Sequence, residues 1–401
     1  MKRIKLSKGR YGLLLGIMMY PLYLITCIIP KKQNLLVLGS TRGHEISDNA
    51  KYLFLYLKEK ERGSIDYFFL TKNRDIYKKA LLKNEQRILY IYTVKGIYTL
   101  IRAKHILLTH ALEDLIPFLL GGKYIHQLWH GSPLKKIGFD ADNWEKSKLK
   151  DTVKKTIYTI FPYTNYMYCN KLYVSSDSLK NVMSSAFNLN KSDIISLGQP
   201  RNDFLLNKKI LPNSALELIS GKYDKVISWL PTHRGFSGKT AEHLLHEYKF
   251  NKSLFNEFLV RNNYLFIIKP HFVERADLEN YLSDCSNILI YEEIDPYPLL
   301  LETDVLITDY SSVLFDYLHL NKQAIFTPFD FEFYTNEIAE LYFEYEDIAY
   351  GPICHDWIEV LEVMKINDQL NYKDKIEVLK QKYGKEDINS CSKIIDYVSN
   401  L

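Results

Sequence analysis

Short apolar runs alternate with amphipathic segments along most of this 401-residue chain. A short apolar run bounded by small or polar residues is typical of a buried strand, and a longer amphipathic segment is typical of a helix. Residues 47–60 are expected to form a helix capped by Ser47, between strands at 34–39 and 66–70. Further strands are expected at 105–109, 124–129, 171–175 and 194–197. This rhythm predicts an α/β fold with parallel sheets.

A second series of the same kind begins near Lys225, with strands expected at 226–230, 264–268 and 305–307. The periodicity is interrupted between Gly198 and Ser220. We therefore predict two Rossmann-like domains facing a cleft, over residues 33–205 and 206–401, and the last helix could pack back on the first domain. The first strand is followed by Gly39-Ser-Thr-Arg-Gly43, which is only loosely similar to a dinucleotide fingerprint, so a hydride-transfer enzyme is disfavoured.

Residues 1–32 have the pattern of a membrane-associating segment. Five basic residues lie within the first ten, an apolar stretch follows from Tyr11 to Pro30, and Lys31 and Lys32 restore the charge. Twenty helical residues span about 30 Å, so a transmembrane helix is one interpretation. Because Pro21 would break the helix, we favour a monotopic or re-entrant anchor on the cytoplasmic face. A cleaved signal peptide is disfavoured, since no small-x-small site ends the stretch.

The composition excludes several classes of protein. A hydrophobic content of 47% allows large cores, and a net charge of +4 is too small to indicate a nucleic-acid partner. The five cysteines are odd in number and far apart, and they lack metal-ligand spacing. They predict neither a disulfide framework nor a zinc site, and they fit a reducing compartment best.

In the segment from Gln127 to Lys136, an apolar run ends at His130. Glycine, serine and proline follow and, after Leu134, two lysines. That order predicts a strand that opens into a loop of functional groups. A histidine there has an unperturbed pKa near neutrality and is suited to proton transfer. The lysines, Lys135 and Lys136, suit a phosphorylated substrate or membrane lipid, although simple solvation is an equal alternative.

Four later clusters complete a set of motifs. They are Gly198-Gln-Pro-Arg201-Asn202-Asp203, Pro231-Thr232-His233-Arg234, Lys269-Pro270-His271 and Thr308-Asp309-Tyr310-Ser311-Ser312-Val-Leu-Phe-Asp316. Together with the His130 segment, and in this order over roughly residues 35–375, they resemble the CDP-glycerol glycerophosphotransferase family of bacterial teichoic acid synthesis. Gly351-Pro352 also resembles a loop of that family. Ser132 stands where the family usually has threonine, a change that keeps the hydroxyl.

The resemblance implies a GT-B fold and a cytidine-diphosphate polyol donor, either CDP-glycerol or CDP-ribitol. It further implies transfer of the polyol phosphate to a lipid-linked saccharide acceptor at the cytoplasmic membrane face, with release of CMP. The N-terminal domain would bind the acceptor and the C-terminal domain the donor. Since nucleotide-activated donors are cytosolic, an exported catalytic domain would have no substrate. No acidic pair stands out as a magnesium site, so no metal ligand is assigned, and Mg²⁺ stays open as a cofactor.

The resemblance also assigns roles to residues. His130 is the candidate base that activates the acceptor hydroxyl, and His271 would contact the diphosphate and assist the leaving group. Ser311 and Ser312 precede an expected helix at 313–320, whose N-terminus could hold donor phosphates. Candidate acceptor-binding residues are Gly131, Ser132 and Lys135. Candidate donor-binding residues are Arg201, Asn202, Thr232, Arg234, Lys269, Thr308, Asp309, Ser311, Ser312 and Asp316.

Some of these residues have structural alternatives to the roles given above. An isolated Lys-Pro-His is commonly a helix cap or a core hydrogen bond, Arg234 could be solvated, and Asp316 could be structural. Two other functions also compete with the transferase. One is a GT-B glycosyltransferase that uses a nucleotide sugar, because that fold hosts many chemistries. The other is a membrane scaffold of a wall-polymer assembly, with no catalysis. The sequence does not separate a glycerol phosphate donor from a ribitol phosphate donor, or a primase from a polymerase.

Overall fold

The computed structural model describes residues 17–60, 65–141, 156–207, 216, 219, 221–234, 239–270, 275–366, 372–384 and 389–401. The chain divides into two compact units, which we describe separately. Unit 1 comprises Met1–His130, Asn143–Arg201 and Asn389–Leu401, and unit 2 comprises Gly131–Asp142 and Asn202–Ile388.

Unit 1 is built on a seven-stranded sheet, in the order β3-β2-β1-β4-β5-β6-β7, in which every pairing is parallel. Its strands are β1 (Lys32–Gly39), β2 (Asp66–Thr71), β3 (Ile88–Tyr90), β4 (Ala103–Leu108), β5 (Tyr124–Gln127), β6 (Lys171–Val174) and β7 (Ile194–Ser196). The strand order reverses between β1 and β4. In open parallel sheets, such a switch point leaves a crevice outside the carboxyl ends of the strands, where ligands bind.

Unit 2 has a five-stranded parallel sheet in the order β10-β9-β8-β11-β12. Its strands are β8 (Lys225–Leu230), β9 (Tyr264–Ile268), β10 (Ile288–Ile290), β11 (Val305–Thr308) and β12 (Gln323–Phe326). Here the order reverses between β8 and β11. The predicted α/β fold with parallel sheets is confirmed, and every strand expected from the sequence is present.

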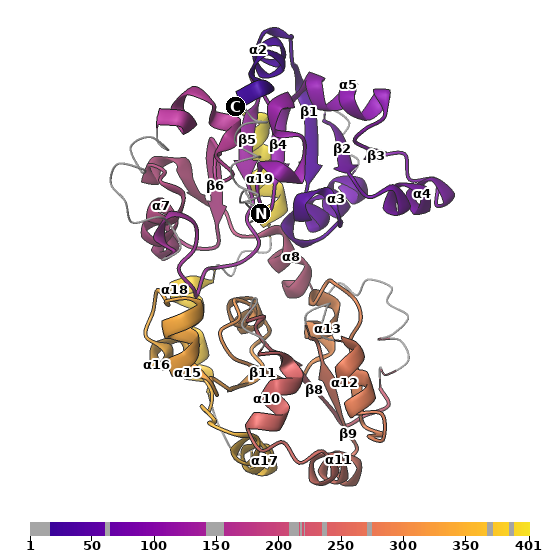
Figure 1. Cartoon of the computed structure of the whole chain (residues 1–401), viewed down its shortest axis with the longest axis vertical. Helices are drawn as coiled ribbons and strands as arrows, with labels where there is room; N and C mark the ends of the chain where they lie inside the picture. The colour runs from indigo at the N-terminus through magenta and orange to yellow at the C-terminus, as the bar shows by residue number, and fades with distance from the viewer. Residues whose placement is uncertain are drawn as a thin grey trace, which may run out of the picture. The chain divides into compact units, whose positions relative to one another are not determined.

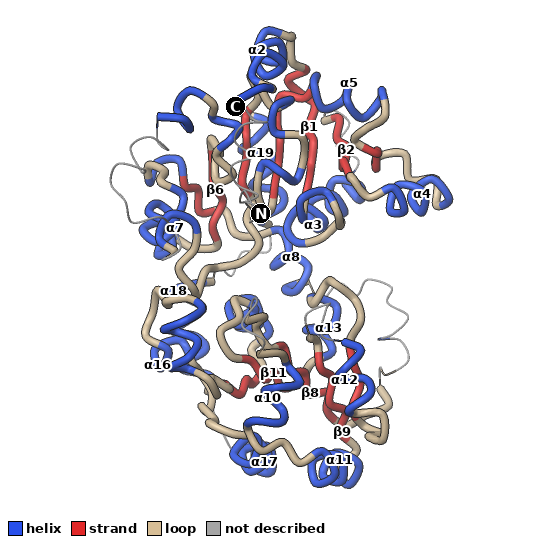
Figure 2. Tube along the Cα trace, viewed as in Figure 1, coloured by secondary structure: helices blue, strands red, loops and turns tan. Residues whose placement is uncertain are grey.

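Helices flank both sheets (Figures 1 and 2). Those of unit 1 are α2 (Tyr20–Ile28), α3 (Asp48–Lys60), α4 (Arg74–Leu82), α5 (Val94–Arg102), α7 (Lys180–Phe187) and α19 (Ser390–Ser399). Those of unit 2 are α10 (Ala241–Glu247), α11 (Lys252–Arg261), α12 (Arg275–Tyr281), α13 (Tyr297–Glu302), α14 (Val313–Tyr317), α15 (Phe331–Phe333), α16 (Tyr345–Ile348), α17 (Trp357–Ile366) and α18 (Lys373–Tyr383). The boundary between the units falls inside α8 (Pro200–Leu206).

Helices α3 and α19 cover one face of the unit 1 sheet. Leu53 and Phe54 of α3 and Ile394 of α19 are buried in one apolar cluster with Leu36 of β1. Burial of such side chains contributes roughly 1.5–3 kcal/mol each. Although α19 follows unit 2 in the chain, it therefore forms part of the core of unit 1.

Helix α2 packs on the body of unit 1 and begins where the sequence predicted a break. Met19 is its N-cap and Pro21 lies in its first turn, where the missing N–H costs nothing. The Tyr23 ring lies 4.6 Å from that of Tyr163. The Gly121 N–H donates to the Thr26 hydroxyl at 3.1 Å, and a Cβ at Gly121 would come within 2.4 Å of the same oxygen.

The predicted anchor, residues 1–32, lies partly outside the described residues, which begin at residue 17. From there to the C-terminus, none of the described helices combines the length and apolar character needed to cross a bilayer. Helix α2 is nine residues long, and several of its apolar side chains are exposed.

Candidate active site

The polar residues of unit 1 gather where three neighbouring strands end. Loops after β1, β4 and β5 carry Thr41, His110 and His130, and these strands are adjacent in the sheet order. The loop after β1 leads into α3, which begins with Asp48. The cluster therefore includes the point where the strand order reverses, the position expected for a binding site in a doubly wound sheet.

The hydrogen-bond partner of His130 determines which ring nitrogen carries the proton. Its Nδ1 lies 2.9 Å from the carbonyl oxygen of Thr109. A carbonyl can only accept, so Nδ1 carries the proton in the neutral ring and donates it to this oxygen. Nε2 is then the basic nitrogen of His130, and a base that acts on a hydroxyl would act through it.

The ring of His130 is held by two aromatic neighbours. It stacks on His110 with centroids 4.3 Å apart and planes 10° apart. Its centroid also lies 4.0 Å from that of Trp129, whose backbone is in the left-handed region at φ 54°. A non-glycine residue in that region costs energy that the surrounding contacts must offset. The predicted strand at 124–129 accordingly ends at Gln127, and its last two residues turn to present His130.

Asn49 secures this turn. Its side-chain amide donates to the carbonyl oxygens of Leu128 at 3.0 Å and Trp129 at 2.8 Å. Its carbonyl oxygen accepts from the backbone N–H of Arg201 at 3.1 Å, and its amide also bonds Gln199. Asn49 is fully buried, so its loss would leave several backbone groups without partners.

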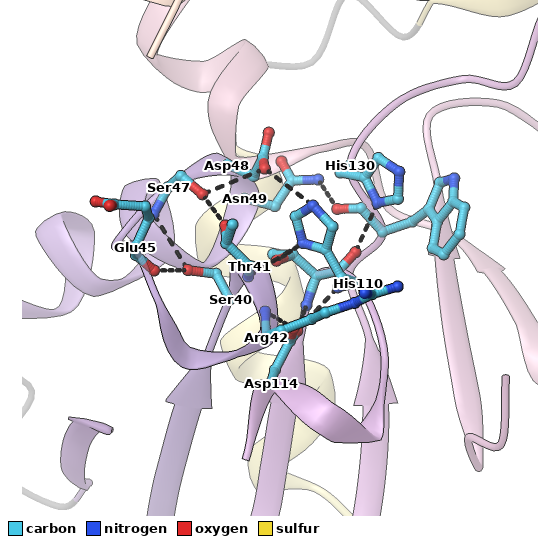
Figure 3. Close-up of polar contacts among 12 residues, drawn as sticks. Ser40, Thr41, Arg42, Glu45, Ser47, Asp48, Asn49, His110, Asp114 and His130 are labelled. Atoms are coloured by element: carbon cyan, nitrogen blue, oxygen red, sulfur yellow. Dashed lines mark hydrogen bonds and ion pairs between the residues drawn. The ribbon is translucent and has the colours of Figure 1, made fainter. Parts of the chain in front are cut away.

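Asp48, the residue before Asn49, joins a separate chain of polar contacts with His110, Ser47 and Thr41 (Figure 3). The Asp48 carboxylate lies 3.9 Å from Nε2 of His110. The Ser47 hydroxyl lies 3.4 Å from the same carboxylate and 2.6 Å from the Thr41 hydroxyl. The backbone N–H of Thr41 donates to Nδ1 of His110 at 3.2 Å, so the proton of the neutral His110 ring is on Nε2, on the side of Asp48.

The loops after β1 and β4 are tied together by Asp114, which is completely buried. Its carboxylate accepts from the backbone N–H groups of Thr109 at 3.0 Å, His110 at 2.9 Å and Arg42 at 2.7 Å. These three backbone donors satisfy both oxygens of the buried carboxylate. Asp114 therefore supports the site without belonging to its reactive surface.

The motif residues of unit 2 meet at the corresponding switch point, between β8 and β11. The guanidinium of Arg234 lies 2.7 Å from the carboxylate of Asp309 and makes two bonds of 2.9 Å to Asp330. Asp309 also accepts from the backbone N–H of Thr232 at 2.9 Å. Arg234, Asp309 and Asp330 are all buried. This network joins the loops that follow β8, β11 and β12.

The sequence suggested that Arg234 is either solvated or bound to the donor, but its contacts are with buried residues of unit 2. The Arg234 guanidinium is bound by the two carboxylates. Its Cζ also lies 5.6 and 5.7 Å from the ring centroids of Tyr310 and Tyr334. Arg234 and Asp309 therefore shape the predicted donor loops from within. Direct contact of either residue with the donor stays a prediction.

The other predicted donor residues have varied surroundings. The Thr308 hydroxyl donates to the Leu230 carbonyl at 3.1 Å, and Asp316 accepts from the Tyr297 hydroxyl at 3.1 Å in the interior of unit 2. Ser311 accepts from the Val313 N–H at 3.4 Å, at the start of the five-residue helix α14. The helix predicted at 313–320 continues beyond α14 only as a 3₁₀ turn, Leu318–Leu320. The burial of Thr308 and Asp316 favours structural roles for both.

The remaining donor candidates lie at strand and helix ends. The backbone N–H of Lys269 donates to the Trp229 carbonyl at 2.9 Å, just after β9. Arg201 and Asn202 lie side by side in α8, and both are buried. Asn202 lies in unit 2, where its amide nitrogen is 3.0 Å from Nε2 of His319. His271 lies outside the described residues, so its role stays a prediction.

The predicted acceptor residues Gly131, Ser132 and Lys135 belong to unit 2, although the sequence placed them in the N-terminal domain. Lys135 forms an antiparallel bridge with Leu341, and the N–H of Lys136 donates to the Glu340 carbonyl at 2.8 Å. Burial lowers the pKa of Lys135, and Asp309 acts in the opposite direction. The chain thus leaves unit 1 directly after His130, a change that strand periodicity does not encode.

Sequence reasoning missed Asp48, Asn49 and His110. His110 follows its strand just as His130 follows the next, and that parallel was the available signal. Asp48 and Asn49 lay within the expected helix at 47–60, where polar residues are normal capping residues. Only the fold brings them next to His130.

The chain is similar to one family of known proteins. Residues 21–400 match the family described as CDP-glycerol:poly(glycerophosphate) glycerophosphotransferase. The chain belongs to this family. The family predicted from the motifs is therefore confirmed, and with it the assignment of the chain to a class of transferases.

Two relatives and one solved structure illustrate the similarity. The chain is 29% identical over 360 residues to a teichoic acid poly(glycerol phosphate) polymerase of Bacillus spizizenii, covering 86% of each protein. It is 26% identical over 391 residues to a teichoic acid ribitol-phosphate primase of the same species, covering 94% of each. Its fold is shared with the wall teichoic acid polymerase TagF, with a TM-score of 0.71, 20% identity and coverage of 100% of this chain and 98% of that one.

Proposed function

We propose that this protein transfers a polyol phosphate, glycerol phosphate or ribitol phosphate, from a CDP-polyol to a lipid-linked saccharide acceptor in the synthesis of teichoic acid or a related surface polymer. The family match over residues 21–400 is the observation that carries this proposal. Relatives named for glycerol phosphate and for ribitol phosphate are both similar to the chain, so the proposal covers both donors.

In the proposed reaction, Nε2 of His130 takes the proton of an acceptor hydroxyl. The hydroxyl oxygen forms a bond to the β-phosphorus of the CDP-polyol as the bond from that phosphorus to the bridging oxygen breaks. CMP leaves with the electron pair of the broken bond, and the polyol phosphate stays on the acceptor as a phosphodiester. The hydrogen bond from Nδ1 to the Thr109 carbonyl supports this role, because it keeps Nε2 basic and stabilises the imidazolium once formed.

The donor is proposed to bind at the carboxyl edge of the unit 2 sheet, at the loops joined by Arg234, Asp309 and Asp330. His271 and Lys269 follow β9, beside β8 in the sheet order, and stay the predicted contacts of the diphosphate. Positive and hydrogen-bonding groups there would stabilise the charge that moves onto CMP.

We also propose that the protein attaches to the cytoplasmic face of the membrane without spanning it. Met18, Leu22, Ile25 and Ile28 expose apolar side chains along one stretch of chain, with exposed fractions of 42–82%. Lys32, which is exposed, follows directly. An apolar helix face next to basic residues suits the boundary between lipid headgroups and acyl chains.

The nucleotide that is released tests the proposed reaction. Purified protein is incubated separately with CDP-glycerol, CDP-ribitol and a panel of UDP-sugars, and the nucleotides are separated by chromatography. We expect CMP from a CDP-polyol, slowly with water and faster with a lipid-linked acceptor. Release of a nucleoside diphosphate from a nucleotide sugar, with none of CMP, would show a glycosyltransferase instead. No release from any donor would favour a scaffold.

A further inference from the structure

The Asp48 carboxylate belongs to the same polar cluster as the proposed base (Figure 3). His130 bonds Thr109 and packs against Trp129 and His110, and Nε2 of the same His110 lies 3.9 Å from the Asp48 carboxylate. The side chain of Asp48 is 22% exposed, unlike the buried Asp114 on the same edge. Asp48 also has a left-handed backbone, with φ 54°, at the start of α3. The fold thus directs a partly exposed carboxylate toward the switch point of the sheet.

His110 lies next to this carboxylate. Its Nδ1 accepts from the Thr41 backbone at 3.2 Å and lies 2.9 Å from the Thr109 hydroxyl. Nε2–H is consequently directed to Asp48, at 3.9 Å. The same ring lies parallel to His130. A single imidazole therefore sets the separation between the carboxylate and the base (Figure 3).

The charge of Asp48 indicates which substrate it would contact. A carboxylate accepts hydrogen bonds from hydroxyl groups and repels phosphate oxygens. The donor presents a diphosphate to the reacting centre, whereas the acceptor presents neutral hydroxyls. A carboxylate near the base therefore disfavours the donor's charged part and favours a hydroxyl of the acceptor.

We propose that Asp48 and His110 form an acceptor subsite for a vicinal diol. One hydroxyl of the diol is the nucleophile and faces Nε2 of His130, and the hydroxyl on the next carbon donates to the Asp48 carboxylate. His110 is a positioning residue that orients Asp48. This inference rests on the proposed function and adds the part of the acceptor that is recognised: the terminal diol of a polyol phosphate chain or of a sugar.

A matched pair of acceptors tests the subsite. One is a lipid-linked disaccharide that ends in glycerol phosphate, and the other is the same molecule ending in 3-hydroxypropyl phosphate, which keeps the primary hydroxyl and lacks its neighbour. With CDP-glycerol as the donor, we expect the wild type to have about tenfold lower kcat/KM for the deoxy acceptor, since a hydrogen bond to a charged group is lost.

The variants Asp48→Asn and His110→Gln should lose most of this discrimination. Because each variant is compared with itself on two acceptors, partial misfolding does not change the ratio. Asp75→Asn is the matched control, since Asp75 is an exposed carboxylate at the start of α4, and it should discriminate as the wild type does.

Three results would contradict the subsite: equal use of both acceptors by the wild type, full discrimination retained in Asp48→Asn, or CMP release with no transfer to either acceptor. Discrimination lost in Asp48→Asn but fully retained in His110→Gln would remove His110 from the proposal. Failure of the proposed function looks different, because the wild type would then release no CMP from CDP-glycerol or CDP-ribitol at all.

Discussion

Burial gives Arg234 a role that its position in a loop motif does not reveal. Its guanidinium has a side-chain exposure of 1% and pairs with two carboxylates that are equally buried. Desolvation makes such a pair costly to form and more costly to break, because the remaining partner stays charged in the interior. Arg234 is therefore first a structural residue of unit 2, whatever contact it makes with a donor.

Replacing Arg234 with methionine should lower the free energy of unfolding by about 3–5 kcal/mol, since Asp309 and Asp330 are left without their partner. Urea unfolding followed by circular dichroism measures the change. Arg261→Met is the control: that arginine pairs with Glu257 on the surface, and its loss should cost about 0.5 kcal/mol or less. An unchanged unfolding energy in Arg234→Met, with a raised KM for the donor, would support the phosphate contact instead.

At this scale the sequence predicted His130 and its place after a strand. It did not predict that residues from a neighbouring strand end and from α3 join His130 in the site. Asp48, Asn49 and His110 are ordinary residues in their local context, a helix start and a strand end. Their functional position depends on the pairing of β1 with β4 and of β4 with β5, which local patterns do not specify.

Strands β4, β5 and β6 carry a buried chain of hydrogen bonds across the unit 1 sheet. The Tyr173 hydroxyl lies 2.8 Å from Nδ1 of His126, and Nε2 of His126 lies 3.1 Å from Nδ1 of His105. Burial raises the pKa of Tyr173, so the tyrosine is the donor. Burial also lowers the pKa of His105 to about 4 and that of His126 well below its usual value. Both histidines are neutral at pH 7.

The neutral buried histidines predict that the protein loses stability in mild acid. In the unfolded protein the two histidines bind protons below a pKa of about 6.5. In the folded protein burial keeps His105 neutral to about pH 4 and lowers the pKa of His126 well below its usual value. The free energy of unfolding should therefore fall as the pH falls from about 6.5 to 4.5, by up to roughly 1.4 kcal/mol per pH unit for each histidine.

Urea titrations at three pH values across that window measure the slope. His105→Leu should reduce the slope by about one proton, because one of the two groups no longer titrates. The exposed His44 provides the control, and His44→Gln should leave the slope as it is. The same slope in His105→Leu and the wild type would contradict the assignment of a neutral buried His105.

Helix α2 is the element on which the proposed membrane attachment depends among the described residues. Its inner face packs through Tyr23 and Thr26, which leaves Leu22 and Ile25 exposed. Replacing both with glutamine should weaken binding to vesicles of anionic lipid about tenfold, because apolar area no longer enters the bilayer.

Co-sedimentation with vesicles measures that binding. Leu82→Gln is the matched control, since Leu82 is an exposed leucine at the end of α4, away from α2 in sequence, and should bind as the wild type does. If the Leu22→Gln/Ile25→Gln variant binds vesicles as tightly as the wild type, α2 is not the attachment surface.

Across the whole molecule, the polar clusters of both sheets lie at the carboxyl ends of the strands. They include the point where the strand order reverses, between β1 and β4 in unit 1 and between β8 and β11 in unit 2. The alternation of apolar and amphipathic segments predicted both series of strands. It missed β3, β10 and β12, which have only three or four residues and lie at the outer ends of their sheets. Such short runs carry too little periodicity to distinguish them from loops.

The sequence suggested that the last helix packs back on the first domain, but it did not predict that residues 131–142 join unit 2. Residues 131–142 belong to unit 2, in which the backbone of residues 134–136 pairs with 340–342. Helix α19 belongs to unit 1, in which its apolar face joins the cluster of α3. Both associations join residues far apart in the chain. Hydrophobic patterning shows that a face is buried, but not which distant partner buries it.

The mass of the acceptor after reaction is the decisive measurement for polyol phosphate transfer. Purified protein is incubated with a lipid-linked disaccharide and either CDP-glycerol or CDP-ribitol, and the lipid product is analysed by mass spectrometry. We predict that the acceptor gains one or more polyol phosphate units with an equal amount of CMP, and that His130→Ala, folded as judged by circular dichroism, forms no such product. An acceptor of unchanged mass with both donors, or the same product from His130→Ala, would contradict the account.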